Sequence, residues 1–255
     1  TNERGGVDID DLRAKADDTV ACLMLTNPNT LGLFDENIEE ISEIMHGVGA
    51  TLYYDGANLN AVMGVSRPGD MGFDIVHGNL HKSFTQPHGG GGPGSGPIAV
   101  SDRIAPYLPV PRVQQRDGRF TLNTDEPKSI GRMRGFQGNF GVFVRSYAYI
   151  CSLGAEGLKA ASETAVLNAN YMLARGREGR VGKYLPVEFD RTAKHEYVLS
   201  AAPAKKELNV KAVAVETTWG NAVAGLQANQ FDVMFVLDAT PQRALAADFP
   251  VQPLF

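Results

Sequence analysis

The start of the chain shows a strand–helix–strand pattern, which restricts the fold more than any other feature of the sequence. VACLML (residues 20–25) is a continuous apolar run of strand length, as expected of a strand buried on both faces. DENIEEISEIMHGVG (35–49) has apolar residues at helical spacing, and TLYYD (51–55) is a second short strand. Because such units join neighbouring parallel strands, the pattern predicts an α/β fold with a parallel sheet.

The rest of the chain predicts a few further elements. We expect a short helix over 7–18, short strands within 72–83 and at 97–101, mostly loop over 102–140, and a long helix over 141–175. HEYVLSA (195–201) predicts a strand in a smaller C-terminal domain.

Three polar motifs each follow a predicted strand: TNP (26–28), DGAN (55–58) and HKS (81–83). In open α/β sheets, ligands bind beyond the carboxyl ends of the strands, where all three motifs are expected. Each motif alone is weak, because a strand-end Asp is usually a turn former, a single Lys is usually solvated, and a His beside it is usually a structural partner. Their joint order at successive strand ends favours a site.

Asp55 and Lys82 together are the pair that pyridoxal phosphate chemistry requires. A lysine amine can hold that cofactor covalently, and a carboxylate can keep its pyridine nitrogen protonated. A small residue two positions after the carboxylate, here Ala57, would pack under the flat ring. His81 could donate a hydrogen bond to the phosphate.

The glycines at 89–92 follow this lysine closely, and His88 precedes them. By composition alone they favour a flexible linker. They could also let the backbone approach a ligand or form an anion-binding nest. No GK[ST] follows, so the segment is not a P-loop.

Composition excludes several classes of protein. A net charge of −5 argues against a general nucleic-acid binder. Cys22 and Cys151 lie in apolar runs, where we expect small buried hydrophobes and no metal site. No apolar run is long enough to span a bilayer, and the start lacks a signal-peptide pattern, so we expect a cytoplasmic protein without a membrane partner. The missing initiator Met suggests that the chain begins inside a larger one.

Two long stretches carry a family resemblance: LTNPNTLGLFDENIEEISEIMHGVGATLYYDGANLNAVMG and RPGDMGFDIVHGNLHKSFTQPHGGGGPGSGPIAV. They resemble the P-protein of the glycine cleavage system, glycine dehydrogenase (decarboxylating). RPGDMGFD and PGSGP are closer to subunit 2 of the two-subunit bacterial form. The likeness covers about residues 1–208.

The resemblance implies an α/β fold of the fold-type-I pyridoxal phosphate class. It implies part of the large domain with its parallel-type sheet over 1–115, and a small C-terminal α+β domain over 116–209. The family places its first strands, its main phosphate-binding loop and its ring-stacking residue before the TNP segment. None of these is present here, so we expect the chain alone to be inactive.

The resemblance also implies the site residues, with Lys82 as the catalytic lysine that carries the cofactor. Asp55 would pair with the pyridinium nitrogen, Ala57 would lie against the ring, and His81 would lie near the phosphate. Thr26 and Asn27 would line the cofactor edge. Arg191 and His195 would face the site from the small domain.

The implied reaction is decarboxylation of glycine with transfer of the aminomethyl group to the lipoyl arm of the lipoylated H-protein, whose disulfide is reduced. The implied partner is subunit 1 of the P-protein, in a heterotetramer. No nicotinamide site is required. The alternatives are another fold-type-I enzyme, such as an aminotransferase or amino-acid decarboxylase, or a non-enzymatic amino-acid-binding fragment.

The last segment, about residues 210–255, departs from this family. TTWGNAVAGLQANQFDV and the DATPQRALAADF that follows resemble a piece of a periplasmic amino-acid-binding protein of a transporter. In that resemblance Thr240, Arg243 and Asp248 would lie near the ligand. The alternative is a diverged tail of the decarboxylase.

Overall fold

The structure, a computed structural model, describes residues 1–86, 94–135 and 138–208. It contains two compact units: residues 1–173 with 187–198, and a second unit whose described part is 174–186 with 199–208. The domain boundaries expected near residues 115 and 209 stay predictions. The expectations for His88, for the glycines at 89–92 and for the segment 210–255 lie outside the described residues.

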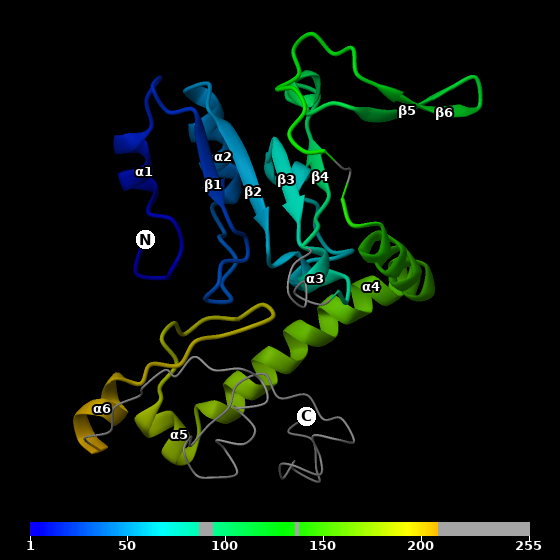
Figure 1. Cartoon of the computed structure of the whole chain (residues 1–255). Helices are drawn as coiled ribbons and strands as arrows, with labels where there is room; N and C mark the ends of the chain where they lie inside the picture. The colour runs from blue at the N-terminus through cyan, green and yellow to red at the C-terminus, as the bar shows by residue number, and fades with distance from the viewer. Residues whose placement is uncertain (87–93, 136–137, 209–255) are drawn as a thin grey trace. The chain divides into compact units, whose positions relative to one another are not determined.

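The first unit contains a four-stranded sheet with the order β1-β2-β3-β4 (Figure 1). Its strands are β1 (Cys22–Leu25), β2 (Thr51–Gly56), β3 (Ile75–Gly78) and β4 (Ile98–Val100). The first three are parallel, and β4 is antiparallel to β3. The helix α2 (Ile38–Gly47) connects β1 to β2, so the predicted strand–helix–strand unit is confirmed.

One face of the sheet packs against helices. Ile41 and Met45 of α2 are buried against Leu52 and Tyr54 of β2. The short helix α1 (Ile9–Lys15) adds partly buried residues to the same core and begins where the Asp8 side chain accepts a hydrogen bond from the Asp11 N–H. This packing fixes the positions of the β1 and β2 carboxyl ends.

The opposite face is more open than the sequence predicts. The expectation that 20–25 is buried on both faces is wrong, because Met24 is 58% exposed and Cys22 is exposed as well. Cys151 is also exposed, so neither cysteine is the small buried hydrophobe expected from its apolar neighbours. In β1, Leu23 and Leu25 pack against the core and are better buried than Cys22 and Met24. Because all four residues are apolar, their sequence does not show this alternation.

Beyond β2 the chain makes short turns before it reaches the site. These are the 3₁₀ segments η1 (Leu59–Ala61) and η2 (Pro68–Met71) and the single-turn helix α3 (Leu80–Ser83). A further 3₁₀ segment, η3 (Ala105–Tyr107), follows β4. Within 102–140, predicted as mostly loop, β5 (Arg112–Arg116) and β6 (Arg119–Asn123) form an antiparallel hairpin.

The long helix predicted over 141–175 is confirmed as α4 (Phe140–Gly176), with a break at Gly154, whose φ is 62°. The second unit contains α5 (Gly179–Tyr184) and α6 (Ala202–Leu208). The segment 195–201, all of it described, forms no strand, so that prediction is wrong. None of the helices in the described residues is long and apolar enough to cross a membrane.

Asp74, directly before β3, ties several elements together through a carboxylate that is only 9% exposed. Its Oδ2 accepts hydrogen bonds from the Leu52 N–H at 3.0 Å, from His46 Nε2 at 2.9 Å and from Arg103 Nη2 at 2.7 Å. Its Oδ1 accepts one from the Ser101 hydroxyl at 3.1 Å. Burial alone would raise the pKa of Asp74, but these hydrogen bonds and the charge of Arg103 lower it overall.

We expect Asp74→Asn to reduce the free energy of unfolding at neutral pH by about 2–3 kcal/mol, because Arg103 loses its carboxylate partner. A lowered folded-state pKa means that this stability is present above the unfolded-state pKa, near 4, and is lost as the pH falls through the folded-state value. Urea unfolding of the whole chain at several pH values between about 6 and 3 measures both effects.

Asp70→Asn is the matched control, because Asp70 pairs with Arg67 on the surface with 61% of its side chain exposed. It should change stability by less than about 1 kcal/mol. Equal stability losses in the two variants, or an unchanged acid slope in Asp74→Asn, would contradict the assignment.

Candidate active site

Asp55 lies at the carboxyl end of β2, on the more open face of the sheet. Its Oδ1 accepts a hydrogen bond from the Ala57 N–H at 3.0 Å and lies 3.1 Å from His77 Nε2. Its Oδ2 accepts a longer one, 3.3 Å, from the Thr26 hydroxyl. The structure therefore brings Thr26, Asp55 and Ala57 together, as their positions after neighbouring strands predict.

Asn27 has a more structural position than the other predicted residues. It is 1% exposed, its Oδ1 accepts a hydrogen bond from the Asp35 N–H at 2.8 Å, and its carbonyl oxygen accepts one from the Tyr54 hydroxyl at 2.7 Å. Its buried Nδ2 has no hydrogen-bond partner among the described residues. Asn27 thus holds the loop after β1 against β2.

His77 is a site residue that sequence reasoning missed. In the parallel register of β2 and β3 it lies directly opposite Asp55. Its Nδ1 lies 3.1 Å from the Tyr53 hydroxyl, and its Nε2 contacts Asp55. The register of two short strands cannot be derived from their sequences. The sequence could therefore suggest which face of β3 His77 lies on, from the alternation of residues, but not that His77 lies opposite Asp55.

A hollow of about 400 Å³ lies beside this cluster. Its lining includes Tyr53, His77, Asn79, His81, Ser95 and Ile98. A volume of this order accommodates a small cofactor. Asn79 is a second candidate residue that the sequence analysis did not identify. Its buried Nδ2 donor has no partner among the described residues.

Lys82 and His81 lie on α3, directly after β3. The Lys82 side chain is exposed, whereas His81 is half-buried and lines the hollow. Because α3 packs against η1, the turn after β2, the helix lies near the segment that follows Asp55. Among the described residues, the ion-pair partner of Asp55 is His77 and not Lys82.

The segment at 195–196 belongs to the same unit and lies within electrostatic range of Lys82. Burial lowers the pKa of His195, and the positive charge of Lys82 lowers it further. Burial raises the pKa of Glu196, and the charge of Lys82 opposes that increase. His195 Nε2 lies 3.1 Å from Glu196 Oε1, so the two side chains form a pair near the lysine.

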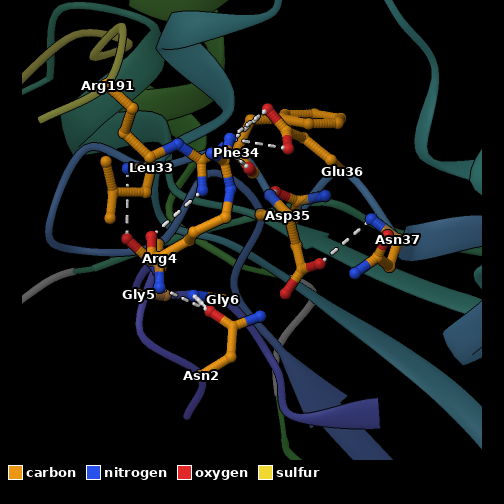
Figure 2. Close-up of polar contacts among 12 residues, drawn as sticks. Asn2, Arg4, Gly5, Gly6, Leu33, Phe34, Asp35, Glu36, Asn37 and Arg191 are labelled. Carbon is orange, nitrogen blue, oxygen red and sulfur yellow. Dashed lines mark hydrogen bonds and ion pairs between the residues drawn. The ribbon is translucent and has the colours of Figure 1, made fainter. Parts of the chain in front are cut away.

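Arg191 has different contacts (Figure 2). Its guanidinium donates to the carbonyl oxygens of Phe34 at 2.7 Å and of Arg4 at 3.2 Å, and it pairs with Glu36 at 3.1 Å. Arg4 pairs with the same Glu36 carboxylate at 3.0 Å. These contacts hold the first residues against the loop after β1, and they occupy the guanidinium that the resemblance implies would face the site.

The described residues contain no group of three or more His, Cys, Asp or Glu side chains placed to hold a metal ion. They do fit pyridoxal phosphate. Among the described residues, only Thr26 donates to Oδ2 of Asp55, by a long bond, so this oxygen can accept another donor. The hollow next to it presents an unpartnered donor on Asn79 and a ring on His81, which suit an anion.

Comparisons with curated proteins agree over most of the chain. A relative from Bacillus velezensis is 57% identical over 206 residues, which are 81% of this chain and 41% of the relative; its name is "Probable glycine dehydrogenase (decarboxylating) subunit 2". A protein of the same name from Caldanaerobacter subterraneus subsp. tengcongensis is 55% identical over 215 residues, 84% of this chain and 43% of the relative. The chain thus spans about two fifths of the length of these relatives. No protein-family model matches the chain.

Solved structures show the same fold. A glycine decarboxylase (P-protein) of the glycine cleavage system, in inhibitor-bound form, has a TM-score of 0.50 and 25% identity over 63% of this chain and 38% of its own. A cysteine desulfurase from Thermococcus onnurineus has a TM-score of 0.52 at 17% identity, over 83% of this chain and 58% of its own. The predicted fold class, that of the fold-type-I pyridoxal phosphate enzymes, is confirmed.

Proposed function

We propose that this chain carries the cofactor-binding lysine of a glycine dehydrogenase (decarboxylating), whose subunit 2 its sequence resembles over about four fifths of its length. The whole enzyme would decarboxylate glycine and transfer the aminomethyl group to the lipoyl arm of the H-protein. Its partners would be subunit 1, in a heterotetramer, and the lipoylated H-protein. The cytoplasmic location expected from the sequence stays a prediction.

The cofactor would be pyridoxal phosphate, held covalently by Lys82. When bound, its ring accepts the electron pair that remains after glycine loses carbon dioxide. Asp55 would accept the N–H of the protonated ring nitrogen through Oδ2, and Thr26 would hold that oxygen in place. Ala57 follows Asp55 closely enough to lie against the ring.

Other groups around the hollow would bind the phosphate and shape the site. Asn79 Nδ2 and the His81 ring line the hollow and would donate to phosphate oxygens. His195 would stay neutral near Lys82, because burial and the lysine charge both lower its pKa.

One observation carries this proposal: Thr26, Asp55 and His77 meet at the carboxyl ends of β1, β2 and β3, and Lys82 follows β3 immediately. The long identity with named glycine dehydrogenases supports glycine over the substrates of other enzymes with this fold. The amino-acid-binding alternative depends on residues 210–255, which lie outside the described part of the chain.

A chimera tests the function while allowing for the partial coverage of the relatives. The matched segment of this chain replaces the corresponding 206 residues of the Bacillus velezensis relative. With pyridoxal phosphate, subunit 1 and lipoylated H-protein, we expect the chimera to exchange labelled bicarbonate into glycine. Exchange in the unmodified relative and none in a folded chimera would contradict the proposal. Amino-group transfer to a keto acid without such exchange would favour the aminotransferase alternative.

A further inference from the structure

Three side chains form a line of contacts on the open face of the sheet. The Tyr53 hydroxyl lies 3.1 Å from His77 Nδ1, and His77 Nε2 lies 3.1 Å from Asp55 Oδ1. Tyr53 and Asp55 are two residues apart on β2, so they point to the same face, and the register places His77 opposite Asp55. The rings of Tyr53 and His77 also contact each other, with centroids 5.6 Å apart.

The donor and acceptor roles in this line follow from the chemistry of its ends. An ionised carboxylate only accepts hydrogen bonds, so His77 must carry a proton on Nε2 and donate it to Asp55. In a neutral imidazole Nδ1 is then an acceptor, and the Tyr53 hydroxyl is the group that donates to it. Burial raises the pKa of Tyr53, and the charges of Asp55 and Cys22 raise it further, so the phenol keeps the proton that it donates.

The two oxygens of Asp55 are consequently unequal. Oδ1 has both the Ala57 N–H and His77 Nε2, whereas Oδ2 has, within the described part of the chain, only the longer bond from Thr26. A carboxylate that can rotate would present either oxygen, but one whose Oδ1 is held by two donors presents Oδ2. The contacts of His77 thus decide which oxygen stays available.

We propose that His77 is a positioning residue, held by Tyr53, which fixes the Asp55 carboxylate so that Oδ2 accepts the pyridinium N–H of the cofactor. This inference rests on the proposed function. His77 touches Asp55 and acts through it. Ile98 of β4, which is apolar, lies opposite His77 in the antiparallel register, and Asn79, His81 and Ser95 also line the hollow.

The first test uses the whole chain without cofactor. In ¹⁵N-labelled protein, nuclear magnetic resonance should show His77 with its proton on Nε2 at neutral pH. In Asp55→Ala the acceptor is gone, and because the Tyr53 hydroxyl can also accept, part of the His77 population should move its proton to Nδ1. A proton on Nδ1 in the wild type, or no change in Asp55→Ala, overturns the inference without bearing on the cofactor.

The second test measures the dissociation constant of pyridoxal phosphate by absorbance. His77→Phe should weaken binding on the order of tenfold, because a hydrogen bond to a charged group is lost. His77→Gln, whose amide can still donate, should stay within about threefold of the wild type. In an Asp55→Ala background, His77→Phe should weaken cofactor binding by no more than about twofold, because the carboxylate that His77 orients is already absent.

The outcomes separate this inference from the proposed function. If neither the wild-type chain nor the chimera binds the cofactor, the proposed function fails and the inference fails with it. If the wild type binds the cofactor and His77→Phe binds it equally well, only the inference fails. The inference alone also fails if His77→Phe lowers the affinity tenfold in the Asp55→Ala background. Urea unfolding of each variant shows whether a lower affinity reflects lost folding, and Tyr53→Phe gives a second, smaller replacement that should also weaken binding.

Discussion

Replacing Lys82 with alanine is expected to abolish the visible absorption band that develops when pyridoxal phosphate is added to the chain. The band requires a covalent bond between the cofactor and an amine, and Lys82 is the lysine that follows β3, the strand whose His77 contacts Asp55 and lines the hollow. The loss should be complete at cofactor concentrations near the protein concentration. In the chimera, exchange of bicarbonate into glycine should fall to background as well.

Lys15→Ala is the control for this result. Lys15 is an exposed lysine that pairs with Asp11 at 2.6 Å, on α1. Aldehydes react weakly with surface lysines, so this variant shows how much of the band arises from such reactions. We expect the Lys15→Ala band to equal that of the wild type. A full absorption band in Lys82→Ala would show that Lys82 does not hold the cofactor.

Replacing Asp55 with asparagine is expected to lower glycine–bicarbonate exchange in the chimera by about 100-fold or more. The amide keeps the size of the side chain, and its single oxygen can still accept from Ala57, but the NH2 group in place of Oδ2 can accept neither from Thr26 nor from a protonated ring nitrogen. The covalent band on Lys82 should survive, because the lysine is intact. The variant thus separates cofactor attachment from catalysis.

The surface variant Asp70→Asn serves here too, since Asp70 is mostly exposed and pairs only with Arg67 among the described residues. It should exchange as fast as the parent chimera. Exchange by Asp55→Asn within about threefold of the parent would show that the carboxylate does not hold the ring nitrogen, and Asp55 would keep only its contacts with Thr26, Ala57 and His77.

The order of the motifs along the chain predicts a candidate site at the carboxyl ends of neighbouring strands. TNP, DGAN and HKS each follow a short apolar run, and the strands they follow are adjacent in the sheet. Apolar runs and helical spacing are local signals, and local signals survive in the fold. The same reasoning predicted α2 and α4 within a few residues of their ends.

Register and exposure could not be derived in this way. His77 enters the site only because β3 pairs with β2 so that it lies opposite Asp55, and a shift by one residue would turn it to the other face. The exposure of Cys22 and Met24 depends on which helices cover the sheet, which no local pattern reports. The hairpin of β5 and β6 lies in a segment whose Pro and Gly content favoured a loop, although its Asp117–Gly118 turn, with positive φ at both residues, is a hairpin signal.

The site residues differ in how much the structure adds to their prediction. Asp55 gains two donors on Oδ1, and Asn27 gains a role in holding a loop. Lys82 gains an electrostatic relation to His195 and Glu196, more than a hundred residues later in the chain. Long-range relations of this kind arise from tertiary packing, so a sequence read alone could name His195 only through family resemblance.

Peptide mapping after borohydride reduction tests the central claim most directly. Reduction makes the bond between cofactor and lysine permanent, so digestion and mass spectrometry identify the lysine that carries it. With one equivalent of pyridoxal phosphate, we predict a single modified peptide, containing Lys82, at close to one label per chain. Label spread over exposed lysines such as Lys15 and Lys159, or none on Lys82, would contradict the account.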